Sequence, residues 1–111
     1  DDARTASQVE PLEQVIDILV ERLRAQHIKR LKDGACSIDT GVVYLDVLNN
    51  VERISDHCSN IAARLVGMEA GEDYDSHTLK NMMHHNPTKE YMLNYEQCRK
   101  DYLIPLEQLE A

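Results

Sequence analysis

The chain has 111 residues, with 12 basic against 20 acidic side chains and a formal net charge of −8. This length is that of one domain with a single core, and the negative charge argues against nucleic acid or an anionic membrane surface as the partner. A cation or a basic protein face fits better, and since no run approaches the roughly 18 apolar residues that span a bilayer, no direct membrane insertion is expected.

Apolar residues recur at spacings of three and four and no stretch alternates at two, which predicts an all-α protein. The first helix is expected over residues 7–32, with Gly34 as its stop. Its start has two interpretations: Ser7 and Glu10 form a capping box, or Pro11 lies in the first turn and moves the start to about Glu10. Its apolar stripe consists of Val9, Ile16, Val20, Leu23, His27 and Leu31.

The second helix is predicted from about Ile38 to Val66 or slightly beyond, with Ser37 as its N-cap. A polar loop is expected over residues 69–75, and DSHTLKNMMHH, residues 75–85, favours a short helix. The heptad pattern of the second helix gives an inward seam of Leu45, Leu48, Glu52, Ser55, Ser59, Ala62 and Val66.

The third helix is predicted to begin with Asn86 as its cap and Pro87 in its first turn, and to end or kink near Pro105. Short connections between long helices predict an antiparallel three-helix bundle, with residues 1–111 as a single domain. The inward face of this third helix is expected to hold Tyr91, Tyr95, Cys98 and Tyr102.

Three cysteines, Cys36, Cys58 and Cys98, are far apart and show no CxxC spacing. This pattern indicates reduced thiols in a cytosol-like compartment rather than a disulfide framework. The chain opens with DDARTAS and has no initiator methionine, so we expect it to be a piece of a longer protein.

Two pairs of acids share the spacing E-x-x-x-D: Glu13 with Asp17, and Glu52 with Asp56. In an antiparallel hairpin with its turn near residue 35, both pairs lie at one level, roughly 30 Å from the turn. Four carboxylates at one level repel each other, and burial adds a desolvation cost, so a bound cation is expected. Oxygen donors suit magnesium, calcium, manganese or iron, and a nearby imidazole extends the choice to zinc or nickel.

The competing interpretation is that the acids face solvent or pair with basic residues of the same helices, and both interpretations stay open. His57 is as consistent with surface or packing as with a ligand role, and Asn60 with a metal ligand as with a cap on a buried carbonyl. His27 is expected to be a core histidine, and His84 with His85 an exposed pair. The candidate basic partners are Arg22, Arg24, Lys29 and Arg53.

The stretch VERISDHCSNIA, residues 51–62, resembles the E-R-[IV]-x-D-H-x-x-N-I-A signature of PhoU domains, and VEPLEQVID is similar to the matching acidic motif on the preceding helix. AQHIKRLKDGACSIDTG, YDSH and KDYLIP resemble the C-terminal, cytoplasmic PhoU domain of bacterial sodium/phosphate cotransporter-family (Na/Pi-cotransporter II-related) proteins. The resemblance therefore covers almost the whole chain. It implies three-helix bundles, commonly two in tandem, whose E/D-x-x-x-D motifs hold multinuclear metal clusters.

The resemblance also implies a metal site and a role. The metal is expected to be iron, zinc, nickel, magnesium or calcium, although a single bundle leaves a cluster shared between bundles incomplete. An oxidase with a carboxylate-bridged metal pair would instead need Glu-x-x-His pairs on two helices, and the chain has none. The implied ligands are Glu13, Asp17, Glu52 and Asp56, with Asn60 and Glu10 as outer candidates.

We therefore expect a non-catalytic, metal-binding domain that regulates phosphate transport. It would lie at the cytoplasmic face of the inner membrane, as a soluble domain beside the membrane-embedded transporter portion of its parent chain. The alternative is a metal-free helical module for protein interaction. Because one bundle lacks a second bundle to cover its apolar surface, a homodimer is also expected.

Overall fold

The computed structural model describes residues 2–71, 76–85 and 87–110, and every element in these ranges is helical. The all-α prediction is therefore confirmed for the described part of the chain. In chain order the elements are α1 (Asp2–Ala6), α2 (Val9–Lys32), α3 (Ile38–Glu69), α4 (Ser76–His85), α5 (Lys89–Cys98), the π-helical turn η1 (Arg99–Leu103) and α6 (Ile104–Glu110).

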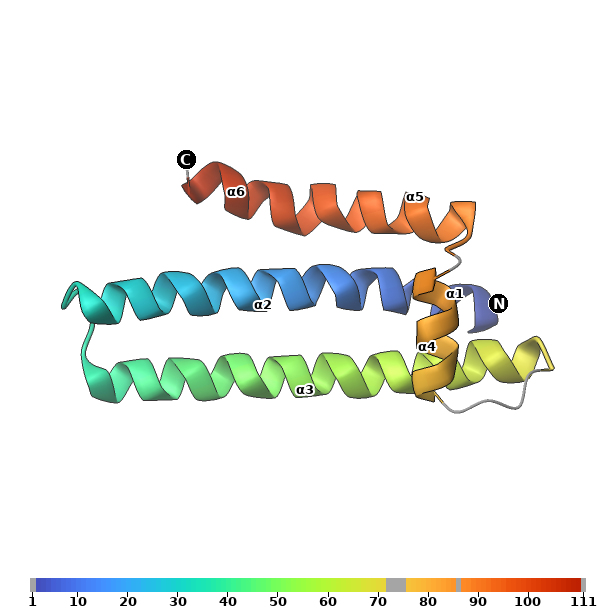
Figure 1. Ribbon diagram of the computed structural model, residues 1–111, viewed down its shortest axis with the longest axis horizontal. Helices are drawn as coiled ribbons and strands as arrows, with labels where there is room; N and C mark the ends of the chain where they lie inside the picture. Colours follow the sequence, from blue (N-terminus) through green and yellow to red (C-terminus); the bar gives the residue numbers. More distant parts are fainter. Residues whose placement is uncertain (1, 72–75, 86, 111) are drawn as a thin grey trace.

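The long helices lie in a row, with α2 between α3 and the continuous segment formed by α5, η1 and α6 (Figure 1). Helix α2 packs against α3, α5 and η1, whereas α3 and α5 make no extensive contact with each other. Helix α3 runs antiparallel to α2, as predicted, whereas the segment formed by α5, η1 and α6 runs parallel to α2 (Figure 1). A three-helix bundle in which all three helices share one core is not confirmed, because the third helix packs on the far side of α2.

The turn between α2 and α3 uses the two local signals that the sequence predicted. Gly34 has a φ of +72°, and its N–H donates to the carbonyl of Leu31 at 3.2 Å. The Ala35 N–H donates to the carbonyl of Arg30 at 2.8 Å, which completes a Schellman motif at the end of α2. Ser37 then caps the first turn of α3 with its side chain.

The two interpretations of the start of α2 bracket its observed start at Val9. No capping box forms, because the Ser7 hydroxyl donates to the carbonyl of Arg4 at 2.6 Å and so belongs to α1. Glu10 lies inside the first turn with 2% of its surface exposed. It is therefore a buried side chain of the helix rather than a capping residue.

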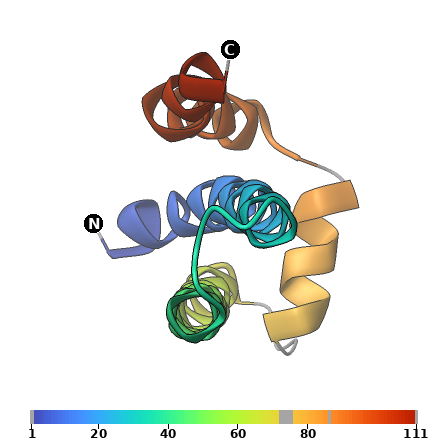
Figure 2. The same cartoon turned by 90° about the vertical axis from the view of Figure 1, so that its left-hand side faces the viewer.

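Helix α3 ends at Glu69, slightly beyond Val66 as predicted, so Gly67 lies inside the helix, against α4. A Cβ added at Gly67 would lie 2.6 Å from Cδ1 of Leu79, whose side chain is 4% exposed. The glycine thus permits α4 to approach α3 closely. This contact places the short predicted helix across α2 and α3 on one side of the row (Figure 2).

The central position of α2 buries residues outside the predicted apolar stripe. Val15 is fully buried, and Pro11 is buried on the same side of the helix. Arg22, also on this side, donates to Glu107 of α6 at 2.7 Å. The stripe predicted from periodicity covers only the side of α2 that faces α3, so it missed the side that packs against the C-terminal helices.

The third predicted helix continues through Pro105, because the π-helical turn η1 precedes this proline. Proline removes a backbone donor and crowds the preceding turn, and a wider turn accommodates both effects. The wider turn also changes the phase of the inward face. Leu103, 2% exposed, takes the buried position predicted for Tyr102, which is 52% exposed.

The described part of the third helix is capped by Thr88, whose hydroxyl accepts from the N–H of Tyr91 at 3.0 Å. The predicted cap, Asn86, lies outside the described residues. Tyr91 is buried as predicted, and Tyr95 and Cys98 are partly buried. All three cysteines are free thiols. Among the described residues, no helix has both the length and the apolar composition that crossing a bilayer requires.

Candidate functional site

The register of the α2–α3 hairpin brings the two predicted acid pairs to one level. The Ser59 hydroxyl donates to Oε2 of Glu10, and near the turn the Nε2 atom of His27 lies 3.1 Å from the carbonyl oxygen of Gly41. In an antiparallel pair of helices, residues that lie at one level have residue numbers with a nearly constant sum. That sum is 69 for the first contact and 68 for the second. The same register pairs position 13 with 56 and position 17 with 52. The level predicted from the turn position thus agrees with the observed contacts.

Glu13 is buried and is hydrogen-bonded to Asp17 of the same pair. Glu13 is 6% exposed, and its pKa is raised to about 8. Burial is the largest cause, followed by the hydrogen bond to Asp17 and the negative charges of Asp17 and Glu10, while the positive charge of Lys80 acts in the opposite direction. The carboxyl of Glu13 is therefore protonated in the folded chain near neutral pH.

Glu52 pairs with a basic residue of the neighbouring helix. Its Oε2 lies 3.6 Å from Nη2 of Arg24, and its side chain is 42% exposed. Arg24 also donates to Glu21 at 2.5 Å and to Asn49 at 2.9 Å. The salt-bridge alternative is thus realised for Glu52 by one of the predicted basic candidates.

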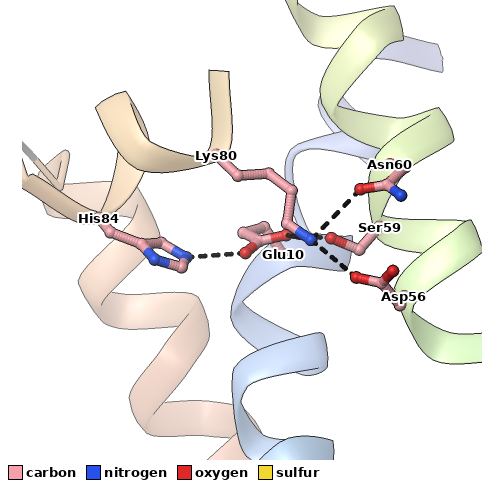
Figure 3. Close-up of polar contacts among 6 residues, drawn as sticks. All are labelled: Glu10, Asp56, Ser59, Asn60, Lys80 and His84. Atoms are coloured by element: carbon pink, nitrogen blue, oxygen red, sulfur yellow. Dashed lines mark hydrogen bonds and ion pairs between the residues drawn. The ribbon is translucent and has the colours of Figure 1, made fainter. Parts of the chain in front are cut away.

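Asp56 pairs with Lys80 of α4, which supplies a positive charge beside the acids (Figure 3). The ammonium of Lys80 lies 3.2 Å from Oδ1 of Asp56, 3.4 Å from Oδ1 of Asn60 and 4.0 Å from Oε2 of Glu10. Side-chain oxygens from α2 and α3 thus surround the ammonium group of Lys80. This is the charge that the convergence of acids on one level required.

Glu10 is the most buried acid of this group and has a partner for each oxygen. Its Oε2 accepts from the Ser59 hydroxyl, and its Oε1 lies 2.7 Å from Nε2 of His84 (Figure 3). Ser59 is fully buried, and the His84 side chain is 37% exposed. A buried carboxylate with these partners is fixed in orientation. Glu10, expected to be an outer ligand, is therefore the centre of a polar cluster.

Tyr91 adds an unpartnered hydroxyl to this region. Its oxygen is buried and has no hydrogen-bond partner among the described residues. Burial is the largest cause that raises the pKa of Tyr91, and the charges of Glu10 and, above its own pKa, of Glu13 raise it further, so the hydroxyl keeps its proton near neutral pH. The site therefore presents one free donor beside two buried acids.

Sequence reasoning missed the contribution of α4. Lys80 and His84 are one turn apart on that helix, so both side chains lie on the same side of it. This spacing was the available signal, but nothing in the sequence indicated that α4 would dock against Glu10. His84 and His85 are both exposed, as predicted, but the prediction did not include the contact of His84 with Glu10.

The other histidines separate into core and surface. His27 is 3% exposed, contacts the Gly41 carbonyl, and has its Nδ1 3.3 Å from Arg30, which confirms its prediction as a core residue. His57 is exposed. Within residues 2–71, 76–85 and 87–110, no three His, Cys, Asp or Glu side chains are arranged to hold a metal ion.

The family model named PhoU domain matches residues 1–65 of the chain. The phosphate-specific transport system accessory protein PhoU homolog 1 of Thermotoga maritima is 25% identical over 73 residues, which are 66% of this chain and 32% of that relative. The PhoU homolog of the same system in Streptococcus pneumoniae is 34% identical over 73 residues, covering 66% of this chain and 34% of the relative.

The matched segment spans about a third of the length of these curated relatives. No solved structure matches the chain significantly. The family match extends from α1 through most of α3 and so includes both acid pairs and their hairpin. The chain belongs to the PhoU domain family.

Proposed function

We propose that this chain is a non-catalytic regulatory domain that acts in phosphate transport. The observation that carries the proposal is the PhoU-domain match over the α2–α3 hairpin, together with relatives named as accessory proteins of a phosphate-specific transport system. The resemblance of AQHIKRLKDGACSIDTG, YDSH and KDYLIP to sodium/phosphate cotransporter-family proteins supports a finer proposal. The domain would lie at the cytoplasmic face of the membrane, attached to the transporter portion of a parent chain.

Removal of this domain from its parent gene tests the proposal. We expect phosphate uptake, measured with radiolabelled phosphate, to lose its normal difference between phosphate-limited and phosphate-replete cells. A Glu10→Ala variant of the complete gene should give the same defect, because Glu10 anchors the α4 contact. Uptake that responds normally to phosphate in the deletion strain would overturn the proposal.

A cation-binding role for the acids is supported by the shared level of the two pairs and by the raised pKa of Glu13. The donor set consists of oxygens, which suits the hard cations expected from the sequence. The geometry does not fit as it stands, since Lys80 neutralises Asp56 and Arg24 neutralises Glu52. A metal ion would therefore compete with these two side chains for the same carboxylates.

The metal-free interpretation rests on the same contacts, since Lys80 already supplies the positive charge. Thermal unfolding with chelator and with added manganese, iron or zinc separates the two roles. For metal binding we expect the melting temperature to rise with metal, and to rise further in Lys80→Met, where the competing ammonium is absent. If metal shifts neither protein, the domain is metal-free and the regulatory proposal stands without the cation.

A further inference from the structure

Helix α3 carries a second apolar surface that the fold leaves exposed. Seven consecutive positions of a heptad pattern, alternately four and three residues apart, face solvent along roughly 31 Å of helix. Ile54 is 63% exposed, Ile61 71% and Met68 68%. A contiguous apolar surface of this size on a soluble protein marks an interaction site. We call this surface the α3 seam; it consists of Val47, Val51, Ile54, Cys58, Ile61, Leu65 and Met68.

The α3 seam lies away from the polar cluster. Asp56 and Asn60, which contact Lys80 of α4, are on the opposite side of α3 from Ile54 and Ile61 by helical geometry. Helix α4 crosses only one side of the row of helices (Figure 2). Helix α1 also packs against α3, but every residue of the seam stays exposed.

Helix α2 extends the apolar surface beside the seam. A groove of about 290 Å³ runs between the two helices and is lined mostly by apolar residues of both, together with Glu13 and Ser55. On the α2 side, partly exposed residues repeat with the same three- and four-residue spacing. The hairpin thus presents two adjacent apolar stripes, as each half of a four-helix bundle does. The α2 stripe consists of Val9, Leu12, Ile16, Leu19 and Leu23.

The α3 seam is complementary to itself in antiparallel orientation. When two copies are related by a two-fold axis that passes beside residue 56, Val51 of one copy faces Ile61 of the other. In the same register Val47 faces Leu65, and Ile54 faces Cys58. Every seam position then meets an apolar residue or a thiol. Tyr44 extends the pairing at one end, where it faces Met68.

The charges beside the seam also favour a second copy over a basic partner. The chain carries 20 acidic residues, yet none occupies the heptad position on the outer flank of the seam. Acids of α3 such as Asp46, Glu52 and Asp56 lie at other heptad positions. A basic partner would be expected to meet an acidic rim, whereas two copies of this chain can approach without placing acid on acid. The flanking residues are Val43, Asn50, His57 and Arg64.

We propose that the chain forms a two-fold homodimer through the α3 seam, in which two α2–α3 hairpins pack into an antiparallel four-helix bundle. The polar cluster with Lys80 and His84 stays on the outer side of each hairpin and remains accessible. The interface is thus separate from this cluster, whereas Glu13 lines the groove between α2 and α3 beneath the interface.

Sedimentation of the 111-residue chain over a concentration series tests the proposal. We expect a dimer for the wild type and a folded monomer for Ile61→Lys, because the ammonium would be buried in the interface. The matched control is Ile38→Lys, at a position 77% exposed on the same helix but outside the seam, which should remain dimeric. Both substitutions reduce the net negative charge equally, so general repulsion does not explain a difference. A monomeric wild type, or equal behaviour of the two variants, would overturn the proposal.

Cysteine cross-linking tests the register in a background in which Cys36, Cys58 and Cys98 are replaced by serine. Val51→Cys combined with Ile61→Cys should give a disulfide-linked dimer on mild oxidation. Within one chain these positions are roughly 15 Å apart along the helix, too far for a disulfide. Val51→Cys combined with Met68→Cys is the off-register control and should stay monomeric in denaturing gels. The antiparallel register is contradicted if only the control forms a covalent dimer, or if neither pair forms one.

Discussion

The two acid pairs have the same spacing and lie at the same level of one hairpin, yet their charges are compensated differently. Glu13 is buried, keeps its proton near neutral pH and is hydrogen-bonded to Asp17. Glu52 and Asp56 are more exposed, and each has its own basic partner, Arg24 and Lys80. Spacing therefore decides where along the hairpin an acid lies. Burial and the neighbouring helices decide whether it is charged.

Glu10 shows the third possibility, a buried carboxylate with several partners. Removing it is expected to have the largest effect on stability, because Ser59, Lys80 and His84 would lose their common acceptor. Glu10→Ala should lower the free energy of unfolding by about 3 kcal/mol or more, as for other broken buried pairs. Urea unfolding measures the loss. Glu69→Ala, at an exposed acid of α3, is the control, and an equally small effect of both would show that the cluster does not stabilise the fold.

Glu13→Gln sharpens the contrast between the pairs by fixing the neutral form. The folded chain holds the Glu13 proton up to a pKa of about 8, whereas the unfolded chain releases it near 4.5. Wild-type stability should therefore fall as pH rises between these values, since the unfolded state binds fewer protons there. Glutamine cannot lose a proton, so the variant should be more stable by at least about 2 kcal/mol above pH 8.

Chemical unfolding across the pH range from 4.5 to 9 checks the sign of this effect. The two proteins should have similar stabilities at the acidic end, and their difference should grow toward the alkaline end. A constant difference across the range would mean that Glu13 titrates alike in the folded and unfolded chains. In that case its burial among Glu10 and Asp17 would have no electrostatic cost.

Local signals in the sequence predicted most of the secondary structure and half of the candidate site. Gly34 and Ser37 defined the hairpin turn, and the turn defined the level of the acids. The packing of the helices against one another was not predictable in the same way. Val15 lies outside the apolar stripe of α2, so the sequence did not indicate that α2 would be covered on two sides. Lys80 was missed for a related reason: its role depends on the docking of α4, which Gly67 permits through a contact between distant segments.

Lys80→Met tests whether one ammonium links the two pairs. Its positive charge lowers the pKa of Glu13 and contacts Asp56, so it acts on both acids. Methionine keeps an apolar stem of similar length but removes the charge. We expect a loss of about 1 kcal/mol at neutral pH, kept small because Asp56 is 55% exposed and can be hydrated.

The pH dependence of Lys80→Met is the more specific measurement. Without the ammonium the pKa of Glu13 should rise further, so the pH range over which stability falls should extend upward. Lys89→Met, at an exposed position in the first turn of α5, is the control. Should both variants keep the wild-type pH dependence, Lys80 does not influence Glu13 and the two pairs are electrostatically independent.

Glu52→Gln is expected to have the smallest effect, and it tests whether this acid does anything beyond a surface ion pair. The Glu52 side chain is 42% exposed and lies 3.6 Å from Arg24, which keeps Glu21 and Asn49 as partners when Glu52 is neutral. Exposed pairs of this kind contribute about 0.2–1 kcal/mol, so in chelator the variant should unfold within about 0.5 kcal/mol of the wild type. The same comparison with added manganese or zinc has a different meaning. A metal-induced rise in melting temperature that Glu52→Gln removes would identify Glu52 as a ligand, and equal melting of both proteins with metal would leave it as the partner of Arg24.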